Sequence, residues 1–204
     1  MVRVAKGVVL ACVLAAALAA GEARAEKTVL NVGMAAIDAG RLDPHLSSTT
    51  PDKALFGWMF NGLVRFKPGT MNPELLEPDL AESWTSTEDG KQWTFKLRHG
   101  VECHHGYGEL TADDIVYSLA RAGDPKRSAF SSDFKDFDKV EAIDKYTVRI
   151  SLKNPVPSLL GLLIPYNGGN VVCKKAAEEM GENFARNRSA PVPSSSASTS
   201  PRSR

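Results

Sequence analysis

The chain has 204 residues, of which 43% are hydrophobic, enough for the core of one domain or two small ones. Its formal net charge is +1, with +2 in residues 1–25 and +4 in residues 186–204, which leaves −5 for residues 26–185. This acidic body argues against a nucleic-acid partner, because such binding needs a basic face that displaces counterions from phosphates.

The N-terminal residues have the pattern of an export signal. Arg3 and Lys6 provide a positive start, Val8–Ala20 is an unbroken apolar run, and Ala23-Arg24-Ala25 supplies small residues at a cleavage site. The run is shorter than the roughly 20 residues of a transmembrane helix. We therefore expect residues 1–25 to be a cleavable signal peptide; the alternative is a buried N-terminal helix.

The next elements are a strand, a loop and a helix. Thr28–Gly33 is typical of a strand that ends at glycine, and Asp38–Ser48 is rich in loop-forming residues. Pro51 suits the first turn of a helix, where its missing N–H costs nothing. Apolar residues then recur at i, i+4 spacing and predict a helix of about three turns; they are Leu55, Phe56, Met59, Phe60 and Leu63. A short strand, Leu63–Phe66, should follow.

The middle of the chain indicates paired strands. Glu77–Trp84 is expected to be a turn with a short apolar anchor, and Asp89-Gly90 a second turn. Strict alternation in Gln92–Arg98 predicts a strand with Trp93, Phe95 and Leu97 on its buried face. The strand pattern of Asp138–Ile143 and Tyr146–Leu152, joined by a polar turn, predicts a hairpin.

A short helix, Leu159–Leu163, should follow the hairpin, with Ser158 at its N-cap. Residues 188–204 contain mostly Ser, Pro and Arg and no aromatic residue. They cannot bury enough apolar area to offset the entropy of ordering them, so we expect this tail to be disordered.

The acidic pair Asp113-Asp114 follows Thr111 and precedes an apolar helical pattern. Thr111 fits the N-cap position, and Asp114 can accept a hydrogen bond from its backbone in a capping box. Both carboxylates also favour the positive end of the helix dipole. The pair therefore has a structural explanation, and we assign it no acid–base role.

A possible metal site lies just before this helix. His99, Cys103, His104 and His105 could gather around zinc or nickel, although adjacent histidines diverge in a strand and do not share one helix face. The alternative is a turn bent by the glycines around them. Export to an oxidising compartment would allow a disulfide between Cys103 and Cys173, but we expect two partly buried thiols.

Six short motifs, in this order, resemble the family 5 extracellular solute-binding proteins, the peptide, nickel and opine receptors of ATP-binding-cassette (ABC) importers. They are LDPH (Leu42–His45), LFGWMFNGL (Leu55–Leu63), DLAESW (Asp79–Trp84), DG (Asp89–Gly90), WTFKLRHG (Trp93–Gly100) and LTADDIVYSL (Leu110–Leu119). The resemblance implies a mixed α/β (α+β) fold, the N-terminal portion of a two-lobed, clamshell (type II) periplasmic binding protein. Such receptors close on a solute about a hinge.

The resemblance also implies a role. We expect a periplasmic receptor of a Gram-negative bacterium, monomeric, without cofactor or catalysis, that binds di- or oligopeptides and docks on permease subunits at the inner membrane. Ser47, Ser48, Thr49 and Thr50 follow the LDPH motif where the family's ligand cleft runs, and could pair with an extended peptide; the alternative is an ordinary polar loop. A nickel-, metal- or opine-linked binder is the alternative solute class. A secreted hydrolase is a weaker one, because no nucleophile with a base is evident.

The chain departs from the family pattern in two places. The turn Cys103-His-His-Gly106 replaces an aromatic residue and a single histidine. Family members are more than twice as long, and after Asn187 this chain turns to its Ser/Pro/Arg-rich tail. We expect residues 26–187 to be a partial family 5 domain, residues 188–204 to derive from a frameshift, and binding to be impaired by the truncation.

Overall fold

The computed structural model describes residue 33, residues 41–185 and residues 193–194. The expected signal peptide, 1–25, and all of the expected first strand except Gly33 lie outside these residues. Residues 41–185 belong to one compact unit, Ala35–Arg204. None of the helices in the described part has the length and hydropathy of a transmembrane span.

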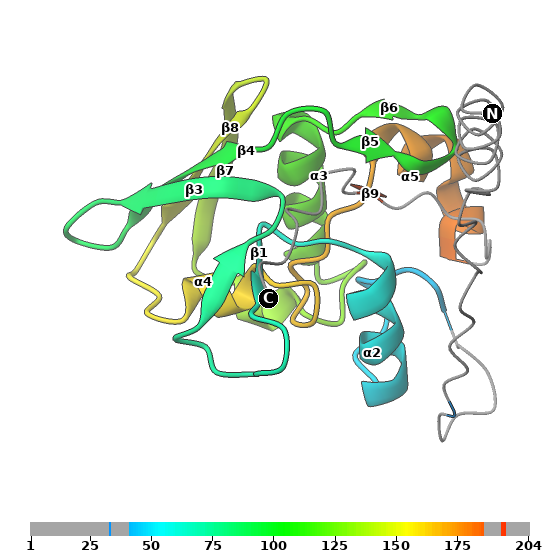
Figure 1. Ribbon diagram of the computed structural model, residues 1–204, viewed down its shortest axis with the longest axis horizontal. Helices are drawn as coiled ribbons and strands as arrows, with labels where there is room; N and C mark the ends of the chain where they lie inside the picture. The colour runs from blue at the N-terminus through cyan, green and yellow to red at the C-terminus, as the bar shows by residue number, and fades with distance from the viewer. Residues whose placement is uncertain (1–32, 34–40, 186–192, 195–204) are drawn as a thin grey trace, which may run out of the picture. The chain divides into compact units, whose positions relative to one another are not determined.

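The largest sheet among the described residues has four antiparallel strands and lies to one side of the view in Figure 1. Its strands, in the spatial order β3-β4-β8-β7, are β3 (Ala81–Ser86), β4 (Gln92–Leu97), β8 (Thr147–Leu152) and β7 (Phe137–Asp144). Phe95 of β4 lies opposite Trp84 of β3 and Val148 of β8, so the apolar positions share one face. The predicted strand at Gln92–Arg98 and the predicted hairpin are confirmed.

Helix α3 (Ala112–Ala122) packs against β7 and β8. It buries Ile115, Leu119 and Ala122, spaced three and four residues apart, in the same core as the apolar face of the sheet. The expected capping box is present, with the Thr111 N–H donating to Asp114 Oδ2 at 2.8 Å. The acidic pair therefore begins the helix, as the sequence predicts.

Two smaller sheets complete the strands. β1 (Val64–Phe66) pairs with β2 (Leu76–Pro78), and β5 (Glu102–Cys103) pairs with both β6 (Gly108–Glu109) and β9 (Pro193–Ser194). β9 places two residues of the tail in a strand, where disorder was expected. For the rest of 188–204, which lies outside the described residues, disorder stays a prediction.

Short helices connect these sheets. They are α2 (Thr50–Met59), α4 (Leu159–Leu162), α5 (Lys174–Met180), and the 3₁₀ segments η1 (His104–Gly106), η2 (Ser131–Phe134) and η3 (Gly181–Ala185). The prediction of a helix at Leu159–Leu163 after Ser158 is confirmed to within one residue. Phe56 and Phe60 of the α2 region pack with Phe184 in a second, smaller apolar cluster.

The first predicted helix ends earlier than its apolar stripe suggests. α2 stops at Met59, and Leu63 lies in the main core instead of on the helix. The reason is tertiary: the Leu63 N–H donates to the carbonyl of Leu163 at 3.1 Å, and a Cβ on Gly62 would lie 2.4 Å from that same oxygen. Only glycine allows this close approach of two backbones.

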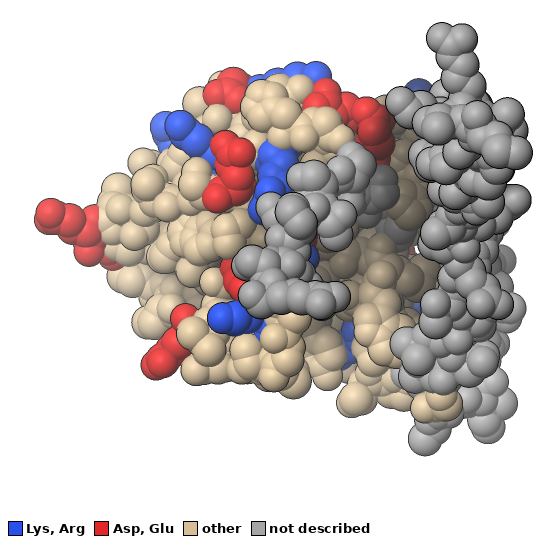
Figure 2. Space-filling view, viewed as in Figure 1, with Lys and Arg blue, Asp and Glu red and all other residues tan. Residues whose placement is uncertain are grey.

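The interpretation of Glu77–Trp84 as a turn and an anchor was wrong. These residues contribute to β2 and β3, separated by a bend at Asp79-Leu80. β3 is an edge strand with an irregularity between Ala81 and Ser83, and most of its side chains are exposed, so it lacks a clear alternation. Figure 2 shows acidic and basic side chains interspersed over one face of the described residues.

Candidate functional site

The candidate ligand segment, Leu46–Thr50, lies between a buried motif and a helix. Asp43, Pro44 and His45 before it are buried, although two of them carry titratable groups. α2 begins at Thr50, the last residue of the segment, with Thr49 at the N-cap and Pro51 in the first turn, as expected for a residue without an N–H. The segment is therefore short and has fixed points on both sides.

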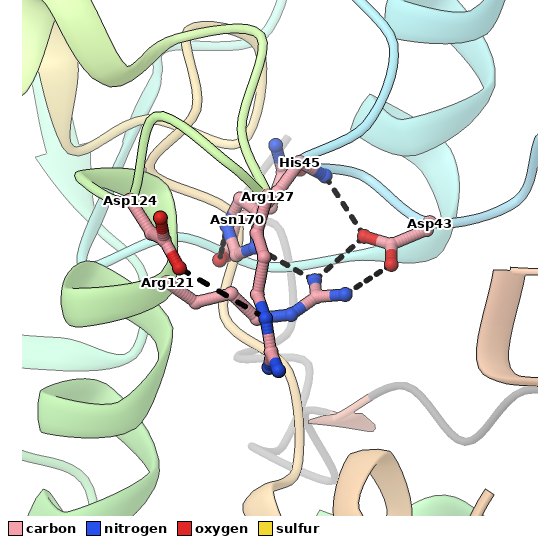
Figure 3. A network of polar contacts seen from close by, with 6 residues as sticks. All are labelled: Asp43, His45, Arg121, Asp124, Arg127 and Asn170. Atoms are coloured by element: carbon pink, nitrogen blue, oxygen red, sulfur yellow. Dashed lines mark hydrogen bonds and ion pairs between the residues drawn. The ribbon is translucent and has the colours of Figure 1, made fainter. Parts of the chain in front are cut away.

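The N-terminal side of the segment is held by a polar network of three buried residues, Asp43, His45 and Asn170, and the half-buried Arg121, here called the His45 network (Figure 3). Arg121 of α3 donates through Nη1 to Asp43 Oδ1 at 2.6 Å and through Nη2 to Asp43 Oδ2. Its Nη1 also lies 3.0 Å from His45 Nδ1, and His45 Nε2 lies 3.0 Å from the carbonyl oxygen of Asn170. Three distant segments thus meet at one imidazole.

The network fixes the protonation state of His45. A guanidinium can only donate, so Nδ1 of His45 accepts, and the ring proton sits on Nε2 and is donated to Asn170. Burial, reinforced by the positive charge of Arg121, lowers the pKa of His45 to about 4. The imidazole is therefore neutral at the pH of most compartments.

Backbone bonds extend the same anchor. The His45 carbonyl accepts from the Ala129 N–H at 2.8 Å, and the Leu42 N–H donates to the Ala185 carbonyl at 3.1 Å. The Arg121 guanidinium also lies over the Phe184 ring, 5.6 Å from its centroid. The loop before α2 is thus tied to α3, to the segment around Asn170 and to η3.

The fixed point on the C-terminal side is Asp52, in the first turn of α2. Its Oδ2 accepts from the Ser47 hydroxyl at 2.5 Å, and the Ser47 Oγ accepts weakly from the Thr49 N–H at 3.4 Å. With Ser47 engaged in this way, Ser48, Thr49 and Thr50 are exposed. The four candidate residues do lie together, three with exposed side chains and one as a tether; solute binding by them stays a prediction.

The metal hypothesis loses its central ligand, because Cys103 forms a disulfide with Cys173. This corrects the expectation of two partly buried thiols: the Cα atoms are 6.2 Å apart, within the range that a disulfide bridges, and both residues are buried. A sulfur in a disulfide is no thiolate ligand. Sequence could not show the pairing, because the cysteines are 70 positions apart.

The histidines of that hypothesis do not converge either. His99 stacks on Tyr146 with 3.8 Å between ring centroids, and His104 and His105 lie edge to face with centroids 6.4 Å apart. Within the described residues, no three His, Cys, Asp or Glu side chains are placed to hold a metal ion together. His105 has φ 59°, so this stretch is a tight turn, in keeping with the alternative weighed in the sequence.

The sequence missed two links of this region. Asp114, expected only as a cap, also accepts from the Lys174 N–H through Oδ1 at 2.8 Å and so ties α3 to α5. Arg121, which pairs with Asp43 across 78 positions, carried no local signal. The LDPH motif offered one hint: an aspartate and a histidine flank its proline, and such polar residues in a short loop can form hydrogen bonds that anchor it.

Comparison with known proteins identifies the family of this chain. The profile of the family described as bacterial extracellular solute-binding proteins, family 5 Middle, matches residues 76–194. The structure is similar to that of MoaA from A. tumefaciens R10 in complex with mannopinic acid, with 52% identity and a TM-score of 0.72 over 74% of this chain and 31% of that one. It also resembles Haemophilus influenzae OppA in complex with the peptide RPPGFSPFR, with 26% identity and a TM-score of 0.66 over 76% and 33% of the two chains.

A curated relative, di/tripeptide-binding protein 2 of Pseudomonas aeruginosa, is 32% identical over 148 residues, which are 64% of this chain and 26% of the relative. The chain thus spans about a quarter to a third of the length of the proteins that it matches. The expected mixed α/β fold of a type II periplasmic binding protein is confirmed for this portion.

Proposed function

Since this chain belongs to family 5 of the bacterial extracellular solute-binding proteins, we propose that it forms part of the receptor that captures a peptide for an ABC importer. The observation that carries the proposal is the family match over residues 76–194, supported by peptide-binding relatives such as the one from P. aeruginosa. The family consists of solute-binding receptors, and we assign no catalytic role to any residue of this chain.

In this proposal the exposed segment of Ser48, Thr49 and Thr50 contacts the solute. Its hydroxyls and backbone groups suit the main chain of an extended peptide, which pairs through hydrogen bonds. This proposal is supported by the hydrogen bonds that hold the segment on both sides, in the His45 network and between Ser47 and Asp52. A segment that is already ordered loses less entropy on binding. In a full-length receptor of this family, the additional residues would form a second lobe that closes on the same solute.

An opine is the second candidate solute. The 52% identity with the mannopinic acid receptor is well above the 32% with the di/tripeptide-binding protein, and this difference favours an opine. Mannopinic acid carries carboxylate and hydroxyl groups, so the exposed hydroxyls and backbone groups of Ser48–Thr50 could serve either solute.

Cell location and partners belong to the same proposal. We place the protein in the periplasm, delivered by residues 1–25 and docking as a monomer on permease subunits at the inner membrane. The disulfide between Cys103 and Cys173 supports this location, since disulfides persist in oxidising compartments and are rare in the cytosol. Cell fractionation, with detection of the N-terminus of the mature chain, tests it directly.

The solute is tested by nuclear magnetic resonance titration of the isotopically labelled chain, a method that also detects weak binding. A dipeptide, an oligopeptide and mannopinic acid are added in separate titrations. We expect one of them to move the backbone amide signals of Leu46–Thr50 and Asp52 in a saturable manner. Shifts confined to other residues, or none with any of the three solutes, would contradict the proposed binding segment.

A further inference from the structure

A half-open groove lies between α3 and β7, and no residue of the ligand segment lines it. Its volume is about 340 Å³, at the small end of the range for pockets that hold small molecules. Leu119, Phe134 and Phe137 contribute apolar side chains to its lining. The rings of Phe134 and Phe137 have centroids 4.9 Å apart; Phe134 is buried and Phe137 is half-buried, so Phe137 supplies the accessible part of this aromatic pair.

The lining is also positively charged. It contains three lysines, Lys135, Lys139 and Lys153, and a single acid, Asp138. Lys139 forms an ion pair with Glu141 at 2.6 Å. Lys153 donates to the backbone carbonyl of Lys135 at 2.9 Å, a contact that brings no negative charge. Among the described residues, no carboxylate forms an ion pair with Lys135 or Lys153.

We propose that this groove is a second binding site, for a small amphipathic carboxylate. The alkyl or aryl part of the ligand would cover the half-buried side chains of Val116, Phe137 and Val140, removing their remaining apolar surface from water. The carboxylate would lie between Lys135 and Lys153, whose charges lack an acidic partner in the described structure. A neutral or cationic molecule of the same shape would gain the apolar contact only.

Decanoate is the probe, and decyltrimethylammonium of the same chain length is its cationic counterpart. In titrations of the labelled full chain we expect decanoate to shift the amide signals of Ala120, Gly123 and Val140, which line the groove. Decyltrimethylammonium should bind at least about tenfold more weakly. Raising NaCl from about 50 mM to about 500 mM should weaken decanoate binding and should not weaken binding of the cationic probe, because salt screens attraction and repulsion alike.

Two variants test the groove independently. Ala120→Trp places a large side chain in the groove from an exposed helix position, and Lys135→Glu with Lys153→Glu reverses the charge of its rim. Each should weaken decanoate binding by roughly tenfold or more. The matched control is Lys67→Glu with Lys91→Glu, which changes the net charge equally at exposed positions outside the groove lining.

The proposal is overturned if both probes shift the same amides with equal affinity, which would mean apolar adsorption alone. It is also overturned if decanoate binds both groove variants as it binds the control. Because the groove shares no residue with Leu46–Thr50, either result leaves the proposed peptide or opine binding untouched.

Discussion

Arg121 donates to Nδ1 of His45 at 3.0 Å, although the two residues are 76 positions apart in the chain. This contact holds the imidazole in the neutral form with its proton on Nε2, where it donates to the Asn170 carbonyl. A buried histidine that is hydrogen-bonded at both ring nitrogens and neutral above about pH 4 holds the three segments in one arrangement. It explains how a loop rich in polar residues can hold the candidate ligand segment in place.

The first prediction concerns acid stability. The pKa of His45 is lowered from 6.5 to about 4, by burial first and by Arg121 second. Between these values the unfolded chain binds a proton at this position and the folded chain does not, so the free energy of unfolding falls as the pH drops from about 6.5 to about 4. The full effect is roughly 3 kcal/mol, taking 1.36 kcal/mol for each pKa unit. Urea unfolding across this pH range measures it.

The control for this prediction is His45→Gln, whose amide cannot titrate. The difference in unfolding free energy between the wild type and this variant should shrink as the pH falls through the same window. Other acids, such as Asp79, affect both proteins alike and cancel in the difference. A difference that does not change with pH would show that His45 is not held neutral.

The second prediction concerns the ion pair. Arg121→Met leaves the buried Asp43 carboxylate without its cation, which should cost about 3–5 kcal/mol of unfolding free energy. Arg65→Met breaks the ion pair between Arg65 and Glu77, whose side chains are 51% and 36% exposed respectively. This change should lower the unfolding free energy by at most about 1 kcal/mol. Chemical unfolding of both variants gives the comparison. Similar small losses in the two would mean that the Asp43 pair is solvated in solution.

The third prediction concerns the disulfide. Linking Cys103 to Cys173 closes a loop of 70 positions, which in the chain-entropy description stabilises the fold by about 4 kcal/mol. Replacing both cysteines with alanine should lower the unfolding free energy by an amount of this order. A Cys12→Ser background keeps the third thiol from exchanging. If adding a reductant leaves the midpoint of urea unfolding of the wild type unchanged, the linkage does not contribute in this way.

The fourth prediction compares two glycines at the end of α2. Gly57 lies inside the helix with open space around its Cα, so Gly57→Ala should stabilise the protein by about 0.5–1 kcal/mol. Gly62→Ala would place a methyl group 2.4 Å from the Leu163 carbonyl oxygen and should destabilise by about 1–3 kcal/mol. The midpoint of thermal unfolding should therefore rise in Gly57→Ala and fall in Gly62→Ala. A shift in the same direction would contradict the close packing at Gly62.

Local patterns predicted much of this fold. The alternation of Trp93, Phe95 and Leu97, the polar turn of the hairpin and the Thr111 cap each act within a few residues, and the structure has all three. The turn lies one residue later than expected, at Lys145-Tyr146. What failed depended on distant partners. The end of α2 depends on the contact of Leu63 with Leu163, about 100 positions away in the chain. The oxidation of Cys103 depends on Cys173, 70 positions away. The candidate segment could be placed by family resemblance, but its support by Arg121 could not.

The last prediction separates a binding role of the Ser48–Thr50 segment from a purely structural one, because it measures solute affinity and stability in the same variants. Thr49→Val and Thr50→Val remove exposed hydroxyls, and the Thr49 side chain makes no capping hydrogen bond, so the unfolding free energy should change by less than about 0.5 kcal/mol. If the hydroxyls bind the solute, the dissociation constant should nevertheless rise by roughly two- to tenfold for each lost hydrogen bond. Thr85→Val, at an exposed position of β3, is the matched control and should leave affinity unchanged. Equal affinities in all three variants would assign the segment to the scaffold and place the solute contacts elsewhere in the chain.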